Sequence, residues 1–422
     1  MRVLVAGAGV GGLTAALALH ANGIAATVVE SVAVPRPLGV GINLLPHAVR
    51  ELTELGLGET LADLAIPTGR MSHFDRHGGL IWAEPRGMAL GYRWPQYSIH
   101  RGELQMALLD AARERLGEAA VRCGTNLLGF EQQDGLVRAR LRDRATGAEE
   151  ILEADVLVGA DGLQSTVRRV LNPDEGGPLW NGIRMWRGVV EADPVLDGRT
   201  MVVAGSNATV KLVVYPISAR TERASGRALL NWVAEAREPD ATAGTADWTR
   251  AGRLADVLPH FADWRWDWLD VPALLSGTDT ILEYPMVDRD PLPRWTHGRV
   301  TLLGDAAHPM YPIGSNGGSQ AILDARVLAY ELARADDPSE GLEAYERARR
   351  EPVNAIVLAC RDMPADRVLH TVAQRAPDGF TRIEDVLSPD ELAGISSAYR
   401  KTSFQDAEAL NTRPSYTIAP PA

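Results

Sequence analysis

The feature that most constrains the fold is a glycine pattern near the N-terminus, Gly7-x-Gly9-x-x-Gly12. It follows a short apolar run at residues 2–6 and opens a helical stretch, after which a second apolar run covers residues 25–29. This order predicts a βαβ unit in which Gly7 permits a tight turn, Gly9 lets a pyrophosphate approach the backbone, and Gly12 allows the helix to pack closely. The free N–H groups at the start of the helix attract phosphates. The sequence therefore predicts an α/β fold with a dinucleotide-binding domain.

An acid at the end of the second strand narrows the choice of ligand. Glu30 follows the apolar run at residues 25–29, where a carboxylate accepts hydrogen bonds from ribose hydroxyls. A negative charge at this place also disfavours a 2′-phosphate, so the pocket should hold FAD or NAD rather than NADP. The alternative, a glycine-rich turn without a ligand, leaves Glu30 unexplained.

Length, charge and cysteine content exclude several classes of protein. The 422 residues are enough for two or three packed units at roughly 150 residues each. The formal net charge of −12 argues against nonspecific binding to nucleic acid or to an anionic membrane. Two cysteines, Cys123 and Cys360, cannot build a disulfide framework, and no Cys/His cluster suggests a metal site. Without a long apolar run or a signal-peptide pattern, we expect a soluble cytoplasmic protein.

The composition of the chain changes along its length. Tryptophans and strand-like runs gather between residues 176 and 292, which indicates an antiparallel sheet inserted into the nucleotide-binding domain. We expect helices at residues 44–64, 101–116, 317–335 and 339–360, and a mobile tail from residue 406. The expected fold is a Rossmann-like dinucleotide-binding domain with an inserted antiparallel sheet and C-terminal helices. Its predicted boundaries are 1–70, 99–175 and 293–338 for the dinucleotide-binding domain, which the resemblance described below implies to be an FAD-binding domain, 71–98 and 176–292 for the inserted sheet, which it implies to bind substrate, and 339–422 for the C-terminal helices and tail.

Two further motifs follow buried strands. Asp161-Gly162 comes after the apolar residues 156–158, and Gly304-Asp305 comes after the apolar residues 299–303. With all three motifs in this order, the chain resembles the single-component (class A) FAD-dependent aromatic monooxygenases of the p-hydroxybenzoate hydroxylase fold. Several stretches are similar to the phenazine-hydroxylase branch (5-methylphenazine-1-carboxylate 1-monooxygenase-like), namely residues 39–52, 231–235, 284–295, 310–321 and 376–380.

The resemblance implies a set of residues that contact FAD. Arg101 and Gln105 would hold the diphosphate, Asp305 the ribityl chain, and the helix that follows residues 312–318 would point its positive end at the flavin pyrimidine. The predicted FAD-binding residues are Gly7, Gly9, Gly11, Gly12, Glu30, Val40, Gly41, Arg101, Gln105, Asp161, Gly304, Asp305, Pro312, Asn316, Gly317 and Gly318.

Three of these assignments have competing interpretations. Arg101 could be a solvated charge at a helix start, and Asp161 could cap the next helix. In the loop before the last helix, Ser315 stands where the family usually has glycine, with Gly314 one place earlier. This departure leaves the conformation of the loop open.

The sequence gives only weak catalytic candidates and no metal site. Asn43 lies where some relatives carry a histidine acting on a phenolic substrate, and asparagine is no base. Lys211 and Tyr215 share one face of a strand, and this face either binds substrate or points outward. We interpret His47, His308 and the cluster Trp264-x-Trp266-x-Trp268 as packing residues rather than catalytic ones.

The resemblance implies a flavin-centred hydroxylation. NADH or NADPH would reduce FAD transiently, since no second GxGxxG follows a strand, and dioxygen would form a flavin C4a-hydroperoxide that hydroxylates a planar aromatic or heteroaromatic ring. Whether decarboxylation accompanies the reaction, which nicotinamide is used, and whether the chain is a monomer or a homodimer stay open. The alternatives are a dehydrogenase or reductase without oxygen transfer, a noncatalytic FAD-binding protein, and a flavin halogenase, for which the expected Trp-x-Trp-x-Ile-Pro stretch is missing.

Overall fold

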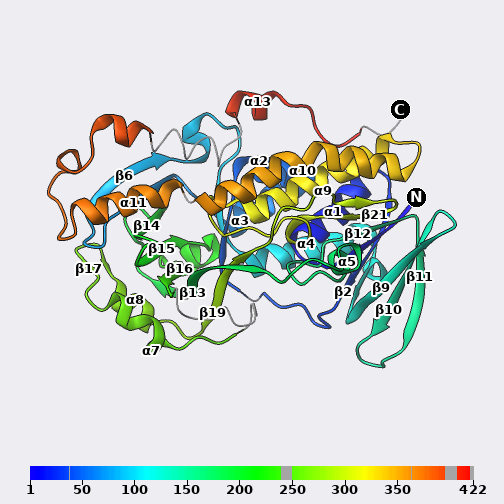
Figure 1. Ribbon diagram of the computed structural model, residues 1–422, viewed down its shortest axis with the longest axis horizontal. Helices are drawn as coiled ribbons and strands as arrows, with labels where there is room; N and C mark the ends of the chain where they lie inside the picture. The colour runs from blue at the N-terminus through cyan, green and yellow to red at the C-terminus, as the bar shows by residue number, and fades with distance from the viewer. Residues whose placement is uncertain (38, 239–249, 363, 395–405, 419–422) are drawn as a thin grey trace.

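A six-stranded sheet forms one half of the molecule in the computed structural model, which describes residues 1–37, 39–238, 250–362, 364–394 and 406–418 (Figure 1). Its strands run in the order β20-β21-β12-β1-β2-β8, and all pairs are parallel except β20 with β21. Residues on the two central strands are buried on both faces, as expected of a parallel sheet covered by helices. The strands are β1 (Arg2–Ala6), β2 (Ala25–Glu30), β8 (Val121–Cys123), β12 (Val156–Gly159), β20 (Thr296–His297) and β21 (Val300–Leu302).

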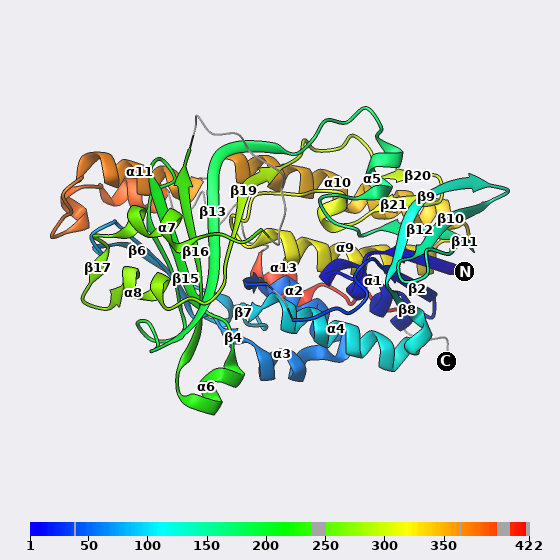
Figure 2. The ribbon, with the colours of Figure 1, turned by 90° about the horizontal axis from the view of Figure 1, so that it is seen from below.

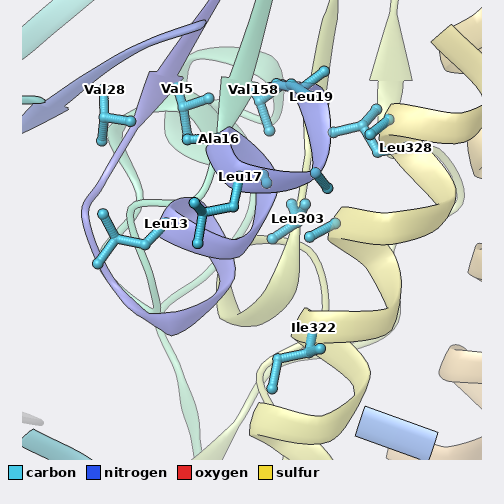
Figure 3. Close-up of a cluster of buried hydrophobic side chains, with 14 of the residues drawn as sticks. Val5, Leu13, Ala16, Leu17, Leu19, Val28, Val158, Leu303, Ile322 and Leu328 are labelled. Atoms are coloured by element: carbon cyan, nitrogen blue, oxygen red, sulfur yellow. The ribbon is translucent and has the colours of Figure 1, made fainter. Parts of the chain in front are cut away.

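The first helix, α1 (Val10–Ala21), is buried on almost every side. Its residues from Gly12 to Leu19 are all buried, because the helix lies against the sheet and between α4 (Arg101–Leu116) and α9 (Asn316–Arg334). Figure 3 shows side chains of α1 meeting Val5 and Val158 of the sheet and Ile322 and Leu328 of α9. Through this core, α1 links the strands of the first and second motifs to the helix after the third.

A second, seven-stranded sheet forms the other half. Its order is β19-β13-β16-β15-β14-β5-β6, and neighbouring strands are antiparallel except β5 with β14. The single parallel pair arises because β5 and β6 come from an earlier part of the chain than the other five strands. The strands are β5 (Arg70–Phe74), β6 (Leu80–Pro85), β13 (Leu179–Ala192), β14 (Thr200–Gly205), β15 (Val210–Pro216), β16 (Ala228–Arg237) and β19 (Ile281–Asp288).

The two faces of the seven-stranded sheet belong to different hydrophobic cores. One face, which we call the inner face, carries Met185, Val213 and Tyr284 and packs against Tyr311 and against α11 (Pro364–Arg375). The opposite face packs against α7 (Leu254–Val257), α8 (Val271–Ser276) and the tryptophan cluster. Trp264 is fully buried in that core, and the Trp266 ring packs at a tilt between the rings of Trp264 and Trp268, so the packing interpretation of these residues is confirmed.

Two connections hold the sheets together. The long helix α10 (Pro338–Asp362) runs from the first half of the molecule towards the second, where α11 continues over the inner face (Figures 1 and 2). A small sheet with the order β3-β7-β4 lies between the halves. Its strands are β3 (Gly41–Leu44), β4 (Ile66–Pro67) and β7 (Tyr97–His100), and the His100 N–H donates to the Ile217 carbonyl at the end of β15, 3.2 Å away.

One expectation about local structure was confirmed and another was wrong. The stretch expected to be helical at residues 44–64 is helical from Pro46 onwards, as α2 (Pro46–Leu52), a π-helical turn (Thr53–Leu57) and α3 (Gly58–Leu64), with an unexpected break at Gly56, where φ is +77°. The tail expected to be mobile contains α13 (Ala407–Thr412) and lies against the first half of the molecule as far as residue 418; residues 419–422 lie outside the described part. Among the described helices, none has the length and apolar character needed to span a bilayer.

Candidate functional site

The first glycine motif forms a tight turn between β1 and α1. Gly7 has φ of +105°, and a Cβ added there would lie 2.4 Å from the Ala160 carbonyl oxygen. A Cβ on Gly12 would lie 2.0 Å from the Gly7 carbonyl oxygen, so both positions exclude a side chain. Gly9, which immediately precedes α1, has nothing within 4 Å of an added Cβ. The helix therefore begins behind a bare turn with open space in front of its N–H groups, which is the geometry that a diphosphate requires.

Two side chains hold this turn in place. Glu30 accepts hydrogen bonds from the Ala8 N–H at 2.8 Å and from the Val32 N–H at 2.7 Å. The Gln105 amide on α4 donates to the Ala8 carbonyl oxygen at 2.8 Å. Arg101 opens α4 with an exposed side chain, and its N–H donates to the Val40 carbonyl oxygen at 3.0 Å. The structure thus brings Glu30, Gln105 and the glycine turn together and leaves the Arg101 guanidinium open to solvent.

The second motif caps a helix. The Asp161 carboxylate accepts from the Thr166 N–H at 2.7 Å, from the Val167 N–H at 3.2 Å and from the Ser165 hydroxyl, all at the start of α5 (Thr166–Leu171). Burial raises the pKa of Asp161, and these hydrogen bonds oppose the rise. The capping interpretation of Asp161 is confirmed; a role towards FAD stays a prediction.

The third motif places the exposed Asp305 carboxylate in front of a buried cluster of hydrogen bonds. Asp305 is exposed, and within the described residues no side chain or backbone group hydrogen-bonds to its carboxylate. Behind it, buried Asp324 of α9 accepts from the Gly304 N–H at 3.2 Å, from His308 Nε2 at 2.5 Å and from Arg349 Nε at 2.7 Å. The motif, α9 and α10 are therefore joined at one carboxylate, and His308 has the structural role expected of it.

The loop before α9 adopts the conformation that its family position demands. Ser315 precedes α9 with φ of +60°, in the left-handed region that glycine usually occupies. A Cβ on Gly317 would lie 3.9 Å from the Asp305 carboxylate, and a Cβ on Gly318 would lie 3.7 Å from Ile42. Ser315 therefore holds a conformation that glycine adopts more readily, and Asp305, the start of α9 and strand β3 lie side by side.

Ser319 connects these two neighbouring segments. Its fully buried hydroxyl accepts from the Leu45 N–H at 3.0 Å and donates to the Ser315 carbonyl oxygen at 3.1 Å. Leu45 precedes α2 and Ser315 precedes α9, so one hydroxyl joins the residues at which both helices begin. Nothing in the sequence pattern indicated this role.

Gly41 is clamped by side chains from three strands of the second sheet. Its carbonyl oxygen accepts from Arg187 Nη2 at 2.5 Å and from the Tyr215 hydroxyl at 2.9 Å, and its N–H donates to Asn231 Oδ1 at 2.8 Å. A Cβ on Gly41 would lie 2.6 Å from Ile217, so this closeness itself requires glycine. The predicted flavin wall at Val40 and Gly41 is thus fixed by the substrate sheet.

The three weak catalytic candidates have different surroundings. Asn43 is buried and accepts from the Ser98 hydroxyl at 2.7 Å. Tyr215 is held on Gly41, and burial raises its pKa, so it remains a protonated donor rather than a base. Lys211 lies on the inner face, but its ammonium is 3.0 Å from Glu235 and 3.1 Å from Asp366 of α11.

The environments of Lys211 and His47 decide against direct chemistry by either side chain. Although burial disfavours the charge of Lys211, its two carboxylate neighbours raise its pKa above the ordinary value, so it stays cationic and engaged. His47 is buried, and burial together with Arg349 and Arg413 lowers its pKa to about 3, which keeps it neutral. Lys211 therefore ties α11 to the sheet, and His47 is a packed residue.

Comparison with known proteins places the chain in a family. A family described as "FAD binding domain" matches residues 1–359. The phenazine 1,6-dicarboxylic acid hydroxylase PhzS of Lysobacter antibioticus is 51% identical over 403 residues, which cover 94% of this chain and 96% of that protein. The chain belongs to the FAD-dependent aromatic monooxygenases. The 3-hydroxybenzoate 6-hydroxylase 1 of Aquipseudomonas alcaligenes is 33% identical over 360 residues, 82% of this monooxygenase and 84% of that one.

A solved structure agrees with this assignment. A variant of HpxO from Klebsiella pneumoniae complexed with FAD superposes on this monooxygenase with a TM-score of 0.75 at 25% identity, covering 94% of this chain and 98% of that one. The fold is that of the p-hydroxybenzoate hydroxylases, and the cofactor is FAD. The sequence-based prediction of fold, cofactor and enzyme class is confirmed, whereas the individual FAD contacts and the domain boundaries stay predictions.

Proposed function

We propose that this monooxygenase hydroxylates a planar, fused heteroaromatic acid of the phenazine type, with NADH or NADPH as reductant. The proposal rests on the inner face of the seven-stranded sheet, which presents apolar side chains directly beside the segments predicted to hold the flavin. Met310 and Ile313, from the loop before α9, pack against this face and stay partly exposed. The similarity to a phenazine dicarboxylic acid hydroxylase over 94% of the chain favours a fused ring over a single one.

The residues present fit FAD. Open space in front of α1 at Gly9 suits the diphosphate, the exposed Asp305 carboxylate suits ribityl hydroxyls, and the start of α9 beyond Ser315 offers unpaired N–H groups to the pyrimidine carbonyls. When bound and reduced, FAD supplies the chemistry that activates dioxygen. The chain supplies orientation of the ring and a site closed to bulk water.

Exclusion of water depends on α11. Val368, Leu369 and Val372 of this helix are buried against the inner face, and the Lys211–Asp366 ion pair fixes its first turn. An aromatic ring held under this helix would be shielded from solvent, which protects reactive oxygen species from release as peroxide.

The test is consumption of NADH and NADPH by purified enzyme over a panel of phenols, hydroxybenzoates and phenazine carboxylates. The proposal requires substrate-dependent consumption with incorporation of labelled oxygen from dioxygen into a phenazine acid and little peroxide. Preference for a single-ring phenol, or peroxide in place of product, would contradict it. Asp305→Ala should purify largely colourless, and a fully yellow, active variant would refute the role given to Asp305.

A further inference from the structure

Arg187 carries a charge that forms no ion pair with a carboxylate among the described residues. This residue of β13 points from the inner face to the Gly41 carbonyl oxygen at 2.5 Å and to the Tyr284 hydroxyl at 3.2 Å, both neutral groups. Within the described residues, no carboxylate lies within 4 Å of its guanidinium. Because buried charges in proteins are generally paired with acids, this arginine is an exception that needs a partner.

The other cations of this neighbourhood are paired. Arg184, three residues earlier on the same strand, meets Glu238 at 2.7 Å and Glu283 at 3.0 Å. Lys211 on the inner face meets two carboxylates, one of them the acid nearest to Arg187 in the sheet, Glu235. Arg187 therefore differs from Arg184 and Lys211 in having no carboxylate partner among the described residues.

Unused hydrogen-bond donors gather at the same place. The Nε of Arg187 and the Nδ2 of Asn231 are both buried and lack an acceptor within the described residues. Asn231 is fully buried, with its oxygen engaged by the Gly41 N–H. In the register of β13 with β16, Arg187 lies opposite Val233, so Asn231 is its diagonal neighbour, at roughly 7–8 Å between backbones and within reach of a long side chain.

We propose that Arg187 and Asn231 bind the carboxylate of the aromatic substrate, which makes the enzyme selective for aromatic acids over neutral analogues. The inference rests on the proposed function and adds the group by which the ring is oriented. A guanidinium with a free edge beside an amide N–H₂ offers only donors, which suits a carboxylate and leaves a neutral amide or unsubstituted ring poorly matched. Arg187 is partly buried as a residue, and its Nε is the buried donor that has no acceptor among the described residues.

This position also orients the ring relative to the cofactor. The same guanidinium holds the Gly41 carbonyl, and Gly41 belongs to the predicted flavin wall. A carboxylate on Arg187 would therefore fix one end of the substrate at a set distance from that wall, close to the buried inner-face residues Met185, Val213 and Val233.

The experiment compares binding of phenazine-1-carboxylate with that of its neutral carboxamide by titrating the flavin absorbance of the holoenzyme. Arg187→Met should weaken binding of the acid 10- to 100-fold and change binding of the carboxamide by less than about threefold. Arg187→Lys, which keeps the charge and loses the fork geometry, should recover part of the loss. Arg184→Met is the matched control on the same strand and should leave both affinities unchanged.

Two results distinguish failure of this inference from failure of the proposed function. If wild-type enzyme binds both compounds but Arg187→Met weakens them equally, Arg187 only positions Gly41, and the inference is wrong. Tyr215→Phe, which removes the other donor to Gly41 without a change in charge, checks this reading because it should affect both ligands alike. If wild-type enzyme binds neither compound, the phenazine-type substrate itself is refuted.

Discussion

The hydroxyl of Ser319 offers a sharp test of how this enzyme builds its flavin site. It receives the Leu45 N–H and donates to the Ser315 carbonyl, so it connects the two segments predicted to enclose the isoalloxazine ring. Ser319→Ala removes a single hydroxyl oxygen from a fully buried position and leaves both helices intact. We expect the variant to fold and to bind FAD more weakly.

The expected loss of FAD affinity follows from the Leu45 N–H, which Ser319→Ala leaves without an acceptor. Leu45 is 2% exposed, so its N–H would lose its partner without gaining water, at a cost of about 1–3 kcal/mol. If the two segments move apart so that the N–H reaches water, they fit the flavin less well, and most of this free energy is lost from FAD binding instead. A loss of 1–2 kcal/mol in binding corresponds to a roughly 5- to 30-fold rise in the dissociation constant of FAD.

The assay is titration of apoprotein with FAD, followed by flavin fluorescence, beside thermal unfolding of the apoprotein. Thr200→Val is the control, since it removes a similarly buried hydroxyl that donates to Asp197 at 2.7 Å in the other sheet. Both variants should lower apoprotein stability, but only Ser319→Ala should weaken FAD binding. Equal FAD affinity in the two variants would show that the Ser319 hydroxyl contributes to stability alone.

Three further substitutions test other parts of the structure. Ser315→Gly should raise the free energy of unfolding by about 0.5–1 kcal/mol in urea titrations, because a left-handed residue costs about 1–2 kcal/mol and glycine returns part of this as chain entropy; no gain would mean that the loop is unstrained. Lys211→Met should cost about 3–5 kcal/mol at pH 8, since it leaves buried carboxylates unpaired. The loss of stability should be smaller at pH 5, because burial raises the pKa of Glu235 above its ordinary 4.5. The folded state therefore binds a proton at Glu235 more tightly than the unfolded chain does, and stability falls as pH rises through the folded-state pKa. A loss independent of pH would contradict this. Arg413→Ala should cost about 1–3 kcal/mol in thermal unfolding because it removes a charged partner from the fully buried carboxylate of Glu51; an unchanged melting temperature would show that the tail contributes nothing.

Apolar periodicity in the sequence predicted helices that bury a regular face in the core. The helix expected at residues 101–116 is α4 (Arg101–Leu116), and the one expected at 317–335 is α9 (Asn316–Arg334). Apolar periodicity marks such segments because each buries one side or all sides in the same core. The break at Gly56 was missed because the apolar pattern continues through it, and only the backbone conformation reveals the kink.

The docked tail could not be predicted because its partners are distant and polar. Arg50 of α2 donates to the Leu410 carbonyl oxygen at 2.8 Å, 360 residues away in sequence. The Ser415 hydroxyl donates to Glu54 at 2.7 Å, and the Ile418 N–H donates to Asn22 at 2.8 Å. A polar, proline-containing segment is normally mobile unless such partners hold it, and these partners leave no periodic pattern in the sequence.

In the candidate site, too, the features with local causes were predicted and those with long-range contacts were missed. Glycine spacing indicated the turn before α1, since each glycine there serves a local need of the backbone. Arg187, Asn231 and Ser319 were missed because their contacts join residues 146, 190 and 274 positions apart. The available signal was an arginine with apolar residues or glycine on both sides, in Met185-Trp-Arg187-Gly-Val-Val190, which marks a charge that the fold must either expose or use.

Two places on the inner face differ in charge, and on the proposed function this difference would give the substrate a direction. At one place the Arg187 cation has no carboxylate within 4 Å among the described residues; at the other, Lys211 is shared by Glu235 and Asp366, so carboxylates outnumber cations there. In the register of the sheet, Arg187 is level with Val233 and Val213, two residues from the level of Glu235 and Lys211, which separates the two places by roughly 7 Å along the strands. A ring with one acidic substituent would gain from pointing it towards Arg187 and would be repelled in the reverse orientation. The cluster that fastens α11 to the sheet would thereby also disfavour the wrong orientation of the substrate.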